Sequence, residues 1–286
     1  MSNIAMWWKN CLHFTLFGGR LLTAFHSKDK QEFDHFYNVF NNLVDFEGDT
    51  DFLNSIEEEV KAFANNQDHL DNYDTESDQL INSRITEQEI LHSLAKLKNS
   101  KSPGPDGIPN EFYKFSADVI VPILVELFNF ILESGVFPSE WTSAVIIPLF
   151  KKGDRRDANN YRGISLLNTL GKIFTSILNR RLCKWSESTN VLSDCQAGFR
   201  KNHSTVDNIF VLYATIQKYL SFRHGKLYCL FVDFSKAFDR VNHSLLMFKL
   251  KSIGVKGNMY RILHSMYSNV KACVRDRNVT SDYLNV

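Results

Sequence analysis

Asp233 is the residue whose type and position most directly suggest chemistry. It follows the apolar run Leu227–Val232, which has the composition of a buried β-strand. A carboxylate at the end of a buried strand is costly unless it is paired or holds a cation. Position alone favours a structural role in which Asp233 caps the next turn. A cation site is the alternative, and the residues around Asp233 shift the balance toward it.

The charge of the chain is divided unevenly between its two parts. The formal net charge of the 286 residues is only +1. Residues 1–84 hold six Lys and Arg against 15 Asp and Glu, a net of −9, whereas residues 85–286 hold 27 against 17, a net of +10. The second part is therefore the one suited to a polyanion such as a nucleic acid. A basic face that is merely solvated is the alternative.

Cysteine usage and hydropathy indicate an intracellular protein with no membrane span. An odd number of widely spaced cysteines, with no Cys-x-x-Cys pair, predicts reduced thiols, and nucleus and cytoplasm both stay open. The five are Cys11, Cys183, Cys195, Cys229 and Cys273. The most apolar N-terminal stretch, Trp7 to Phe25, is interrupted by charged residues, so we expect neither a membrane helix nor a signal peptide there.

Local signals predict the elements that must position these residues. Thr86 and Glu89 form a capping box, which predicts a helix from Thr86, and a second helix is expected over 116–134 with Gly135 as its stop. The prolines and glycines of Lys101–Pro109 predict a fixed, extended turn. Further strands are predicted at 145–150, 227–232 and 270–275. One further helix is predicted to end near Trp185, and another to run from Ser204 to about Leu220. Two more helices are predicted at 243–253 and 257–268.

The N-terminal residues 1–84 give fewer signals. Aromatic and apolar residues at helical spacing within 33–43 predict an amphipathic helix. Residues 66–84 are rich in Asp, Asn, Ser and Gln, which is typical of a linker or a surface loop.

The stretch Leu230–Val241 resembles the first catalytic motif of non-LTR, LINE-type reverse transcriptases. Four other stretches match the same family in the same order, and they are Lys101–Pro109, Ile147–Asp154, Asn160–Asn168 and Gln196–Thr205. Each stretch is weakly specific alone, whereas five in order are strongly specific. The resemblance covers residues 85–286 and leaves residues 1–84 without an assignment.

The resemblance implies an α+β fold of the right-hand polymerase type. Residues 1–84 would then be a helical extension with an acidic linker, residues 85–226 the reverse transcriptase fingers, and residues 227–286 a truncated palm. The implied reaction joins a deoxynucleotide (dNTP) to the 3′ hydroxyl of a DNA primer on an RNA template and releases pyrophosphate.

In this family two Mg²⁺ ions assist that reaction, and hard cations of this kind take oxygen ligands. The resemblance makes Asp233 the first metal-binding carboxylate, with the backbone carbonyl of Phe234 as a companion ligand. Phe238 matches the steric gate that favours deoxynucleotides, and the alternative is a core phenylalanine. Asp239 is better explained as a partner of Arg240 or a cap of the following helix.

Four basic residues match family positions that contact phosphate. Lys151 and Arg162 match the positions that hold the incoming triphosphate, since lysine offers a point charge and arginine a fork of donors. Arg200 and Lys201 match a basic turn along the template path. Gly163 departs from relatives that often carry proline there, and this leaves the placing of Arg162 open.

The sequence also departs from the family at the second carboxylate motif. No Asp-Asp pair occurs in it, and the Gln-Gly segment that precedes that motif in relatives is missing. One carboxylate holds two divalent ions poorly, so we expect this chain as given not to polymerise DNA. A non-catalytic nucleic-acid-binding module is the alternative function, and a structural protein that binds no nucleic acid is a third.

Overall fold

The computed structural model describes residues 50–65, 76–155, 160–222, 226–234, 241–276 and 279–285 of the chain. Its mixture of helices and one small sheet confirms the expected α+β class. The helices are α3 (Thr50–Asn65), α5 (Glu76–Asn82), α6 (Glu87–Ala95), α7 (Asn110–Phe115), α8 (Ala117–Ser134), α9 (Ser139–Thr142), α10 (Thr169–Ser188), α11 (Thr205–Leu220), α12 (His243–Ser252) and α13 (Gly257–Ser268). The strands are β1 (Ser143–Phe150), β2 (Tyr161–Leu166), β3 (Lys271–Asp276), β4 (Val279–Thr280) and β5 (Leu284–Asn285).

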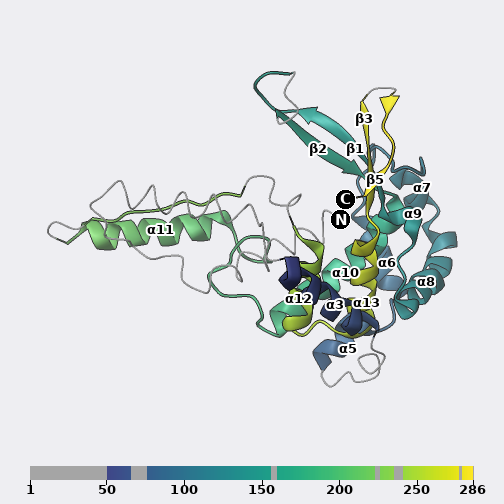
Figure 1. The fold of residues 1–286 in the computed structure, drawn as a ribbon, viewed down its shortest axis with the longest axis horizontal. Helices are drawn as coiled ribbons and strands as arrows, with labels where there is room; N and C mark the ends of the chain where they lie inside the picture. The colour runs from purple at the N-terminus through teal and green to yellow at the C-terminus, as the bar shows by residue number, and fades with distance from the viewer. Residues whose placement is uncertain are drawn as a thin grey trace.

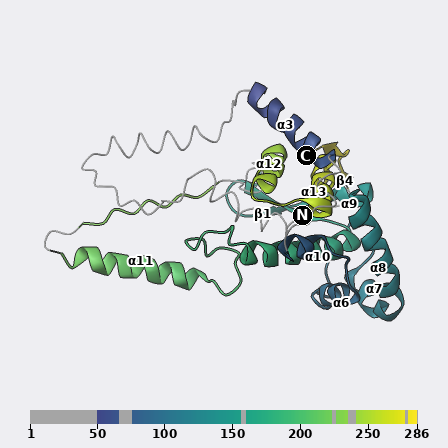
Figure 2. The same ribbon diagram turned by 90° about the horizontal axis from the view of Figure 1, so that it is seen from below.

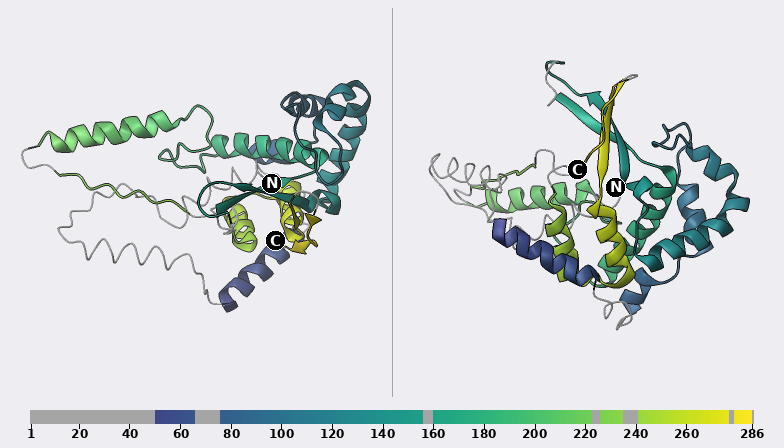
Figure 3. Two further views of the ribbon diagram at one scale, coloured as in Figure 1. Left: turned by 90° about the horizontal axis from the view of Figure 1, so that it is seen from above. Right: turned by 45° about the vertical axis from the view of Figure 1, so that its right-hand side comes forward.

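The helices form a body from which the sheet and one helix project. In Figure 1 the β1–β2 hairpin rises above the body, and α11 extends away from it on the side opposite α8. Figure 2 and the left-hand view of Figure 3 show α8 at the edge of the molecule and α11 apart from the other helices. In agreement with its position, α11 buries none of its residues.

One hydrophobic core joins elements that are far apart in the sequence. Phe128 of α8, Ile177 of α10 and Tyr260 of α13 are almost fully inaccessible to solvent, and they belong to the same cluster as Val60 of α3 and Ile81 of α5. The core therefore continues across the boundaries expected near residues 84 and 226. The division into an N-terminal extension, fingers and partial palm remains a prediction.

The sheet is built around β1. In the order β2-β1-β3-β4, β1 pairs with β2 antiparallel and with β3 parallel, while β5 also pairs with β3. The β1–β3 register sets Ala144 beside Ala272 and Val145 beside Cys273. The parallel pairing brings residues 271–276 beside residues 143–150, although more than 100 residues of chain separate them.

Most of the local predictions are confirmed. The capping box of Thr86 and Glu89 is present at the start of α6, and Gly135 ends α8 with a φ of 68°. Ser204 caps α11 together with Asp207. The strands near 145–150 and 270–275 and the helices near 243–253 and 257–268 also form. The four cysteines within the described part of the chain are free thiols.

Two predictions are wrong, and one lies outside the described residues. Residues 76–82, expected as part of a linker, form α5, because Ile81 is buried in the core and Asn82 donates to the Asp78 carbonyl. Residues 227–232 form no strand: a strand needs a neighbour for its backbone hydrogen bonds, and none pairs with this segment in the described structure. The helix predicted within 33–43 falls outside the described residues.

Arg181 of α10 ties the N-terminal elements to the body. Its guanidinium donates to both oxygens of Glu89, at 2.9 and 2.7 Å, and to the backbone carbonyls of Ile81, Ser83 and Arg84. Burial raises the pKa of Glu89, but the hydrogen bond and charge of Arg181 outweigh this and lower that pKa to about 2. The capping box of α6 is thus part of a buried ion pair. No helix in the described part of the chain is long and apolar enough to cross a membrane.

Candidate active site

The β1–β2 hairpin carries both of the predicted triphosphate-binding residues. Leu149 pairs with Arg162 across the hairpin, and the Lys151 backbone N–H donates to the Asn160 carbonyl at 2.9 Å, which continues the ladder. Since side chains alternate between the two faces of a hairpin, Lys151 and Arg162 lie on the same face as diagonal neighbours. Both residues are exposed. The register therefore brings two cations together on one solvent-facing surface.

The loop at the tip of the hairpin is held by its own contacts. The Asn160 side chain donates to the Asp154 carbonyl at 2.9 Å, and the Tyr161 hydroxyl donates to the Arg155 carbonyl at 3.0 Å. The Arg155 guanidinium lies 5.1 Å from the centre of the Phe150 ring, a cation–π distance. Arg155 thus has a role within the loop, whereas Lys152 is simply exposed.

Gly163, which raised doubt about Arg162, is a regular member of β2. It pairs with Pro148 of β1. A Cβ at Gly163 would lie 3.0 Å from a methyl carbon of Ile146, so the side-chain space there is already filled. The absence of proline at this position does not disturb the pairing of the neighbouring Arg162.

The proline- and glycine-rich turn Lys101–Pro109 packs closely against the end of β2. A Cβ at Gly104 would lie only 2.4 Å from the backbone carbonyl carbon of Leu167, so any larger residue would force the two segments apart. Gly107 has a φ of 70° and donates its N–H to the Gly104 carbonyl at 3.1 Å. Two of the family-like stretches therefore meet, although some 60 residues separate them.

Asn168 fastens this junction, and its role was missed in the sequence. Its side-chain oxygen accepts the Asp106 N–H at 3.1 Å, and its side-chain nitrogen donates to the Glu140 carbonyl at 2.9 Å. It thereby links the turn to α9, which leads directly into β1. The signal available was the position of Asn168 just before a predicted helix, where asparagine serves as a cap. Here the side chain instead bonds two distant segments.

The two predicted template-contacting residues differ in what they can offer. Arg200 donates to both oxygens of Glu187, at 3.1 and 2.8 Å, and to the carbonyls of Ser193 and Gln196. The hydrogen bond to Arg200 lowers the pKa of Glu187. Arg200 thus stabilises its own turn and has few donors left for a ligand, whereas Lys201 is exposed. Template contact by either residue remains a prediction.

Asp233 lies in an exposed, extended segment rather than at the end of a buried strand. Residues 226–234 have no regular secondary structure, and the Phe231 side chain is 79% exposed. Asp233 itself is exposed, and Phe234 beside it is 37% exposed. Phe238 falls outside the described residues. Asp233 thus lies in segment 226–234, whereas Lys151 and Arg162 lie on the β1–β2 hairpin.

The donor set expected for Mg²⁺ is not assembled in the described part of the chain. That part contains no group of three or more His, Cys, Asp or Glu side chains arranged to hold a metal. A lone exposed carboxylate is a poor site for two divalent ions. Asp233 and the Phe234 carbonyl in this arrangement therefore do not fit a two-metal centre.

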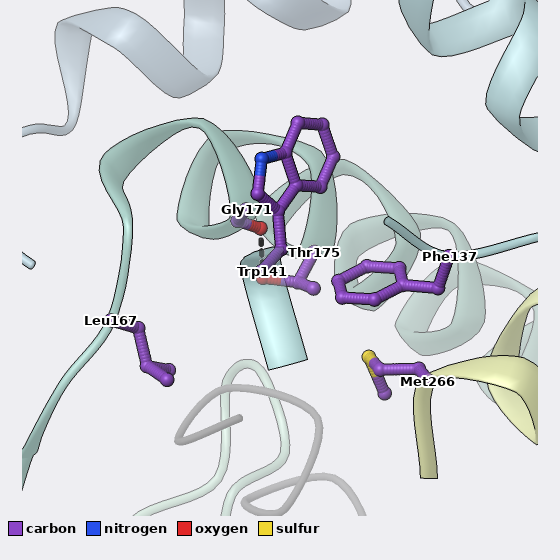
Figure 4. Close-up of a pocket in the computed structure, with 6 residues that line it drawn as sticks. All are labelled: Phe137, Trp141, Leu167, Gly171, Thr175 and Met266. Carbon is purple, nitrogen blue, oxygen red and sulfur yellow. Dashed lines mark hydrogen bonds between the residues drawn. The ribbon is translucent and has the colours of Figure 1, made fainter. Parts of the chain in front are cut away.

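Two hollows in the described structure are lined by other residues. Figure 4 shows a cavity of about 10 Å³ lined by Phe137, Trp141, Leu167, Gly171, Thr175 and Met266, in which the Thr175 hydroxyl donates to the Gly171 carbonyl at 2.8 Å. It has room for about one water molecule and is a packing gap in the core. A larger hollow of about 410 Å³ lies near Glu140 and Lys271. Neither hollow includes a predicted site residue.

Comparison with known proteins supplies the family. Residues 150–283 match the family described as reverse transcriptase (RNA-dependent DNA polymerase). The RNA-directed DNA polymerase from mobile element jockey of Drosophila melanogaster is 34% identical over 174 residues, which are 60% of this chain and 19% of that protein. The probable RNA-directed DNA polymerase from transposon BS of the same organism is 34% identical over 197 residues, 68% of this chain and 21% of that protein.

A third relative gives the same assignment. The probable RNA-directed DNA polymerase from transposon X-element of Drosophila melanogaster is 30% identical over 201 residues, 69% of this chain and 22% of that protein. The chain thus spans about a fifth of the length of the curated relatives it matches. Over the matched residues, the chain belongs to the reverse transcriptase family of the kind encoded by non-LTR retrotransposons.

Proposed function

We propose that this chain is part of an RNA-directed DNA polymerase of a retrotransposon, and that its β1–β2 hairpin binds the triphosphate of an incoming dNTP. The observation that carries the proposal is the hairpin register, which sets Lys151 and Arg162 on one exposed face. A lysine ammonium and an arginine fork side by side suit a polyphosphate. The contacts within the loop fix the backbone beneath them, which lowers the entropic cost of binding.

An RNA template and a DNA primer are the proposed macromolecular partners. Residues 85–286 carry the net charge of +10, and Lys201 is exposed in the basic turn before α11. A template–primer hybrid would be held through its phosphate backbone and its shape rather than its sequence. In the right-hand polymerase arrangement that we propose, the hairpin belongs to the fingers.

The catalytic centre is a separate part of the proposal. The resemblance alone would make Asp233 the first metal-binding carboxylate, the Phe234 carbonyl its companion and Phe238 the steric gate. The exposed position of Asp233 does not fit two Mg²⁺ ions, and the sequence has no Asp-Asp pair to complete them. These 286 residues are therefore proposed to bind nucleotide and nucleic acid without joining them.

Nucleotide binding tests the hairpin. We expect Lys151→Ala and Arg162→Ala each to weaken the binding of a fluorescent dNTP by about tenfold, as for the loss of a charge-assisted hydrogen bond to phosphate. Lys152→Ala is the matched control, since it removes the same charge from a neighbouring exposed residue. Equal effects of all three substitutions would show non-specific charge attraction and would remove the basis for the proposed site.

Primer extension and a salt series separate the two candidate functions. We expect the chain to bind an RNA–DNA hybrid with an affinity that falls steeply with salt, and to extend no primer in the presence of Mg²⁺. Template-dependent dNTP incorporation would refute the proposed lack of catalysis. Failure to bind hybrid even at low salt would refute both the polymerase proposal and the alternative of a non-catalytic binding module.

A further inference from the structure

The outer surface of α7 and α8 carries an unusually apolar stripe. Five large side chains share it at spacings of four, four, four and three residues: Phe115 (81% exposed), Val119 (72%), Ile123 (63%), Leu127 (37%) and Phe130 (70%). We call these five residues the α8 stripe. α8 lies at the edge of the molecule in Figures 1 and 2, in agreement with the exposure of these side chains.

The α8 stripe is not needed for the core. The opposite side of the helix already packs into the body through Val121, Leu124 and Phe128, which are at most 5% exposed. A helix that is apolar on both sides is normally buried on both sides. A contiguous exposed apolar patch on a soluble domain marks an interaction surface.

The residue order of the stripe is nearly the same in both directions about Ile123. Two helices packed antiparallel across a two-fold axis at Ile123 would set Val119 opposite Leu127. Phe130 would then face the junction of α7 and α8 at Ser116, next to Phe115 in sequence. A two-fold interface needs one surface that is complementary to itself, and this order supplies it.

Charged residues border the stripe. Arg84 is held between two acidic residues of α8, with nitrogen–oxygen distances of 3.6 Å to Glu126 and 3.2 Å to Glu133.

The exposed area is sufficient for a dimer. If a large apolar side chain has an area of about 200 Å², the exposed fractions of the five residues add up to roughly 650 Å² per copy. A standard specific interface buries about 800 Å² per partner. The stripe and its charged edge together reach this range.

We propose that the α8 stripe is a self-association surface through which two copies of this chain pair antiparallel about Ile123. This inference concerns a surface remote from Lys151 and Arg162 and does not depend on the proposed polymerase function. The occupant it commits to is a second copy rather than a different protein.

The full chain in the absence of nucleic acid provides the test, by sedimentation or light scattering over a concentration series. We expect a dimer whose dissociation constant rises about 100-fold in Ile123→Glu, because two charges would meet at the axis. Ile209→Glu is the matched control: it changes the same residue type at 64% exposure on another apolar helix, α11, and should leave the dimer intact.

Mixing two variants makes the test specific for the axis. Ile123→Glu and Ile123→Lys should each be monomeric, and an equimolar mixture should recover the dimer because opposite charges then meet. A monomeric parent chain at high concentration overturns the proposal, as does dimer loss in Ile209→Glu but not in Ile123→Glu. Failure of the mixture to recover the dimer also overturns it, since residue 123 would then not face its own copy.

Discussion

The buried ion pair of Arg181 and Glu89 gives the sharpest prediction about stability. Arg181→Ala removes the partner of a carboxylate that is only 19% exposed and the donor to three backbone carbonyls. Breaking a buried pair by removing one member costs about 3–5 kcal/mol, because the remaining charge is left unpaired. Arg180 also lies 3.4 Å from a Glu89 oxygen and keeps part of its charge paired, so we expect the free energy of unfolding at neutral pH to fall by about 3 kcal/mol, the lower end of that range.

The same pair predicts a pH dependence with a definite sign. The pKa of Glu89 is lowered from 4.5 to about 2, so the folded state binds this proton more weakly than the unfolded state. Its contribution is fully present above about pH 4.5 and is lost as the pH falls toward 2. At about 1.4 kcal/mol per tenfold change in proton affinity, the contribution is about 3 kcal/mol, which solvent access to the carboxyl reduces to about 2 kcal/mol.

Urea unfolding of the parent chain and of Glu89→Gln, between roughly pH 5 and pH 3, measures this contribution. The parent should lose about 1 kcal/mol more than Glu89→Gln over that range, because roughly half of the contribution disappears above pH 3 and the amide does not titrate. Glu87→Gln is the control, because Glu87 is exposed in the same helical turn. Parallel pH curves for the parent and Glu89→Gln would show that Arg181 does not hold a charged Glu89 in the folded protein.

Three shorter predictions concern other parts of the molecule. Gly104→Ala should destabilise the chain by about 1–3 kcal/mol because its Cβ meets the backbone of the β2–α10 junction, whereas Gly198→Ala, with open space around it, should be neutral in the same thermal unfolding assay. Burial lowers the pKa values of His243 and His264, so the unfolding free energy should decline as the pH falls below about 6.5, and a flat profile there would contradict this. Arg162→Lys should recover only part of the dNTP affinity lost in Arg162→Ala, since an ammonium cannot form the fork; full recovery would show that charge alone matters.

Predictions from the sequence were reliable where the determining contacts are local. Thr86 and Glu89 are three residues apart, and Gly135 ends α8 by its own backbone conformation, so both helix boundaries could be read directly. The strand at 227–232 could not, because a strand depends on a distant partner and apolar composition does not reveal whether one is present. Local pattern and tertiary pairing gave different answers there.

For the candidate site, the sequence identified individual residues but not their arrangement in space. Lys151 and Arg162 were found by resemblance, but only the β1–β2 register shows that they share a face. Arg181 was missed, although it falls at the spacing of the buried residues Phe174, Ile177 and Trp185 on α10. A charged residue on the apolar face of a predicted helix signals a buried ion pair. Its partner, 92 positions earlier, is fixed only by the fold.

The residues proposed for chemistry are largely distinct from those that hold the fold. Lys151, Arg162 and Lys201 are exposed, whereas the core depends on buried side chains such as Phe128 and Ile177. Substituting the exposed residues should therefore change ligand binding with little change in stability, because surface substitutions away from buried networks are nearly neutral. Weaker nucleotide binding by Arg162→Ala at unchanged stability would then report on the site itself. Arg200 lacks this separation, since the guanidinium that would meet the template also holds its turn to Glu187.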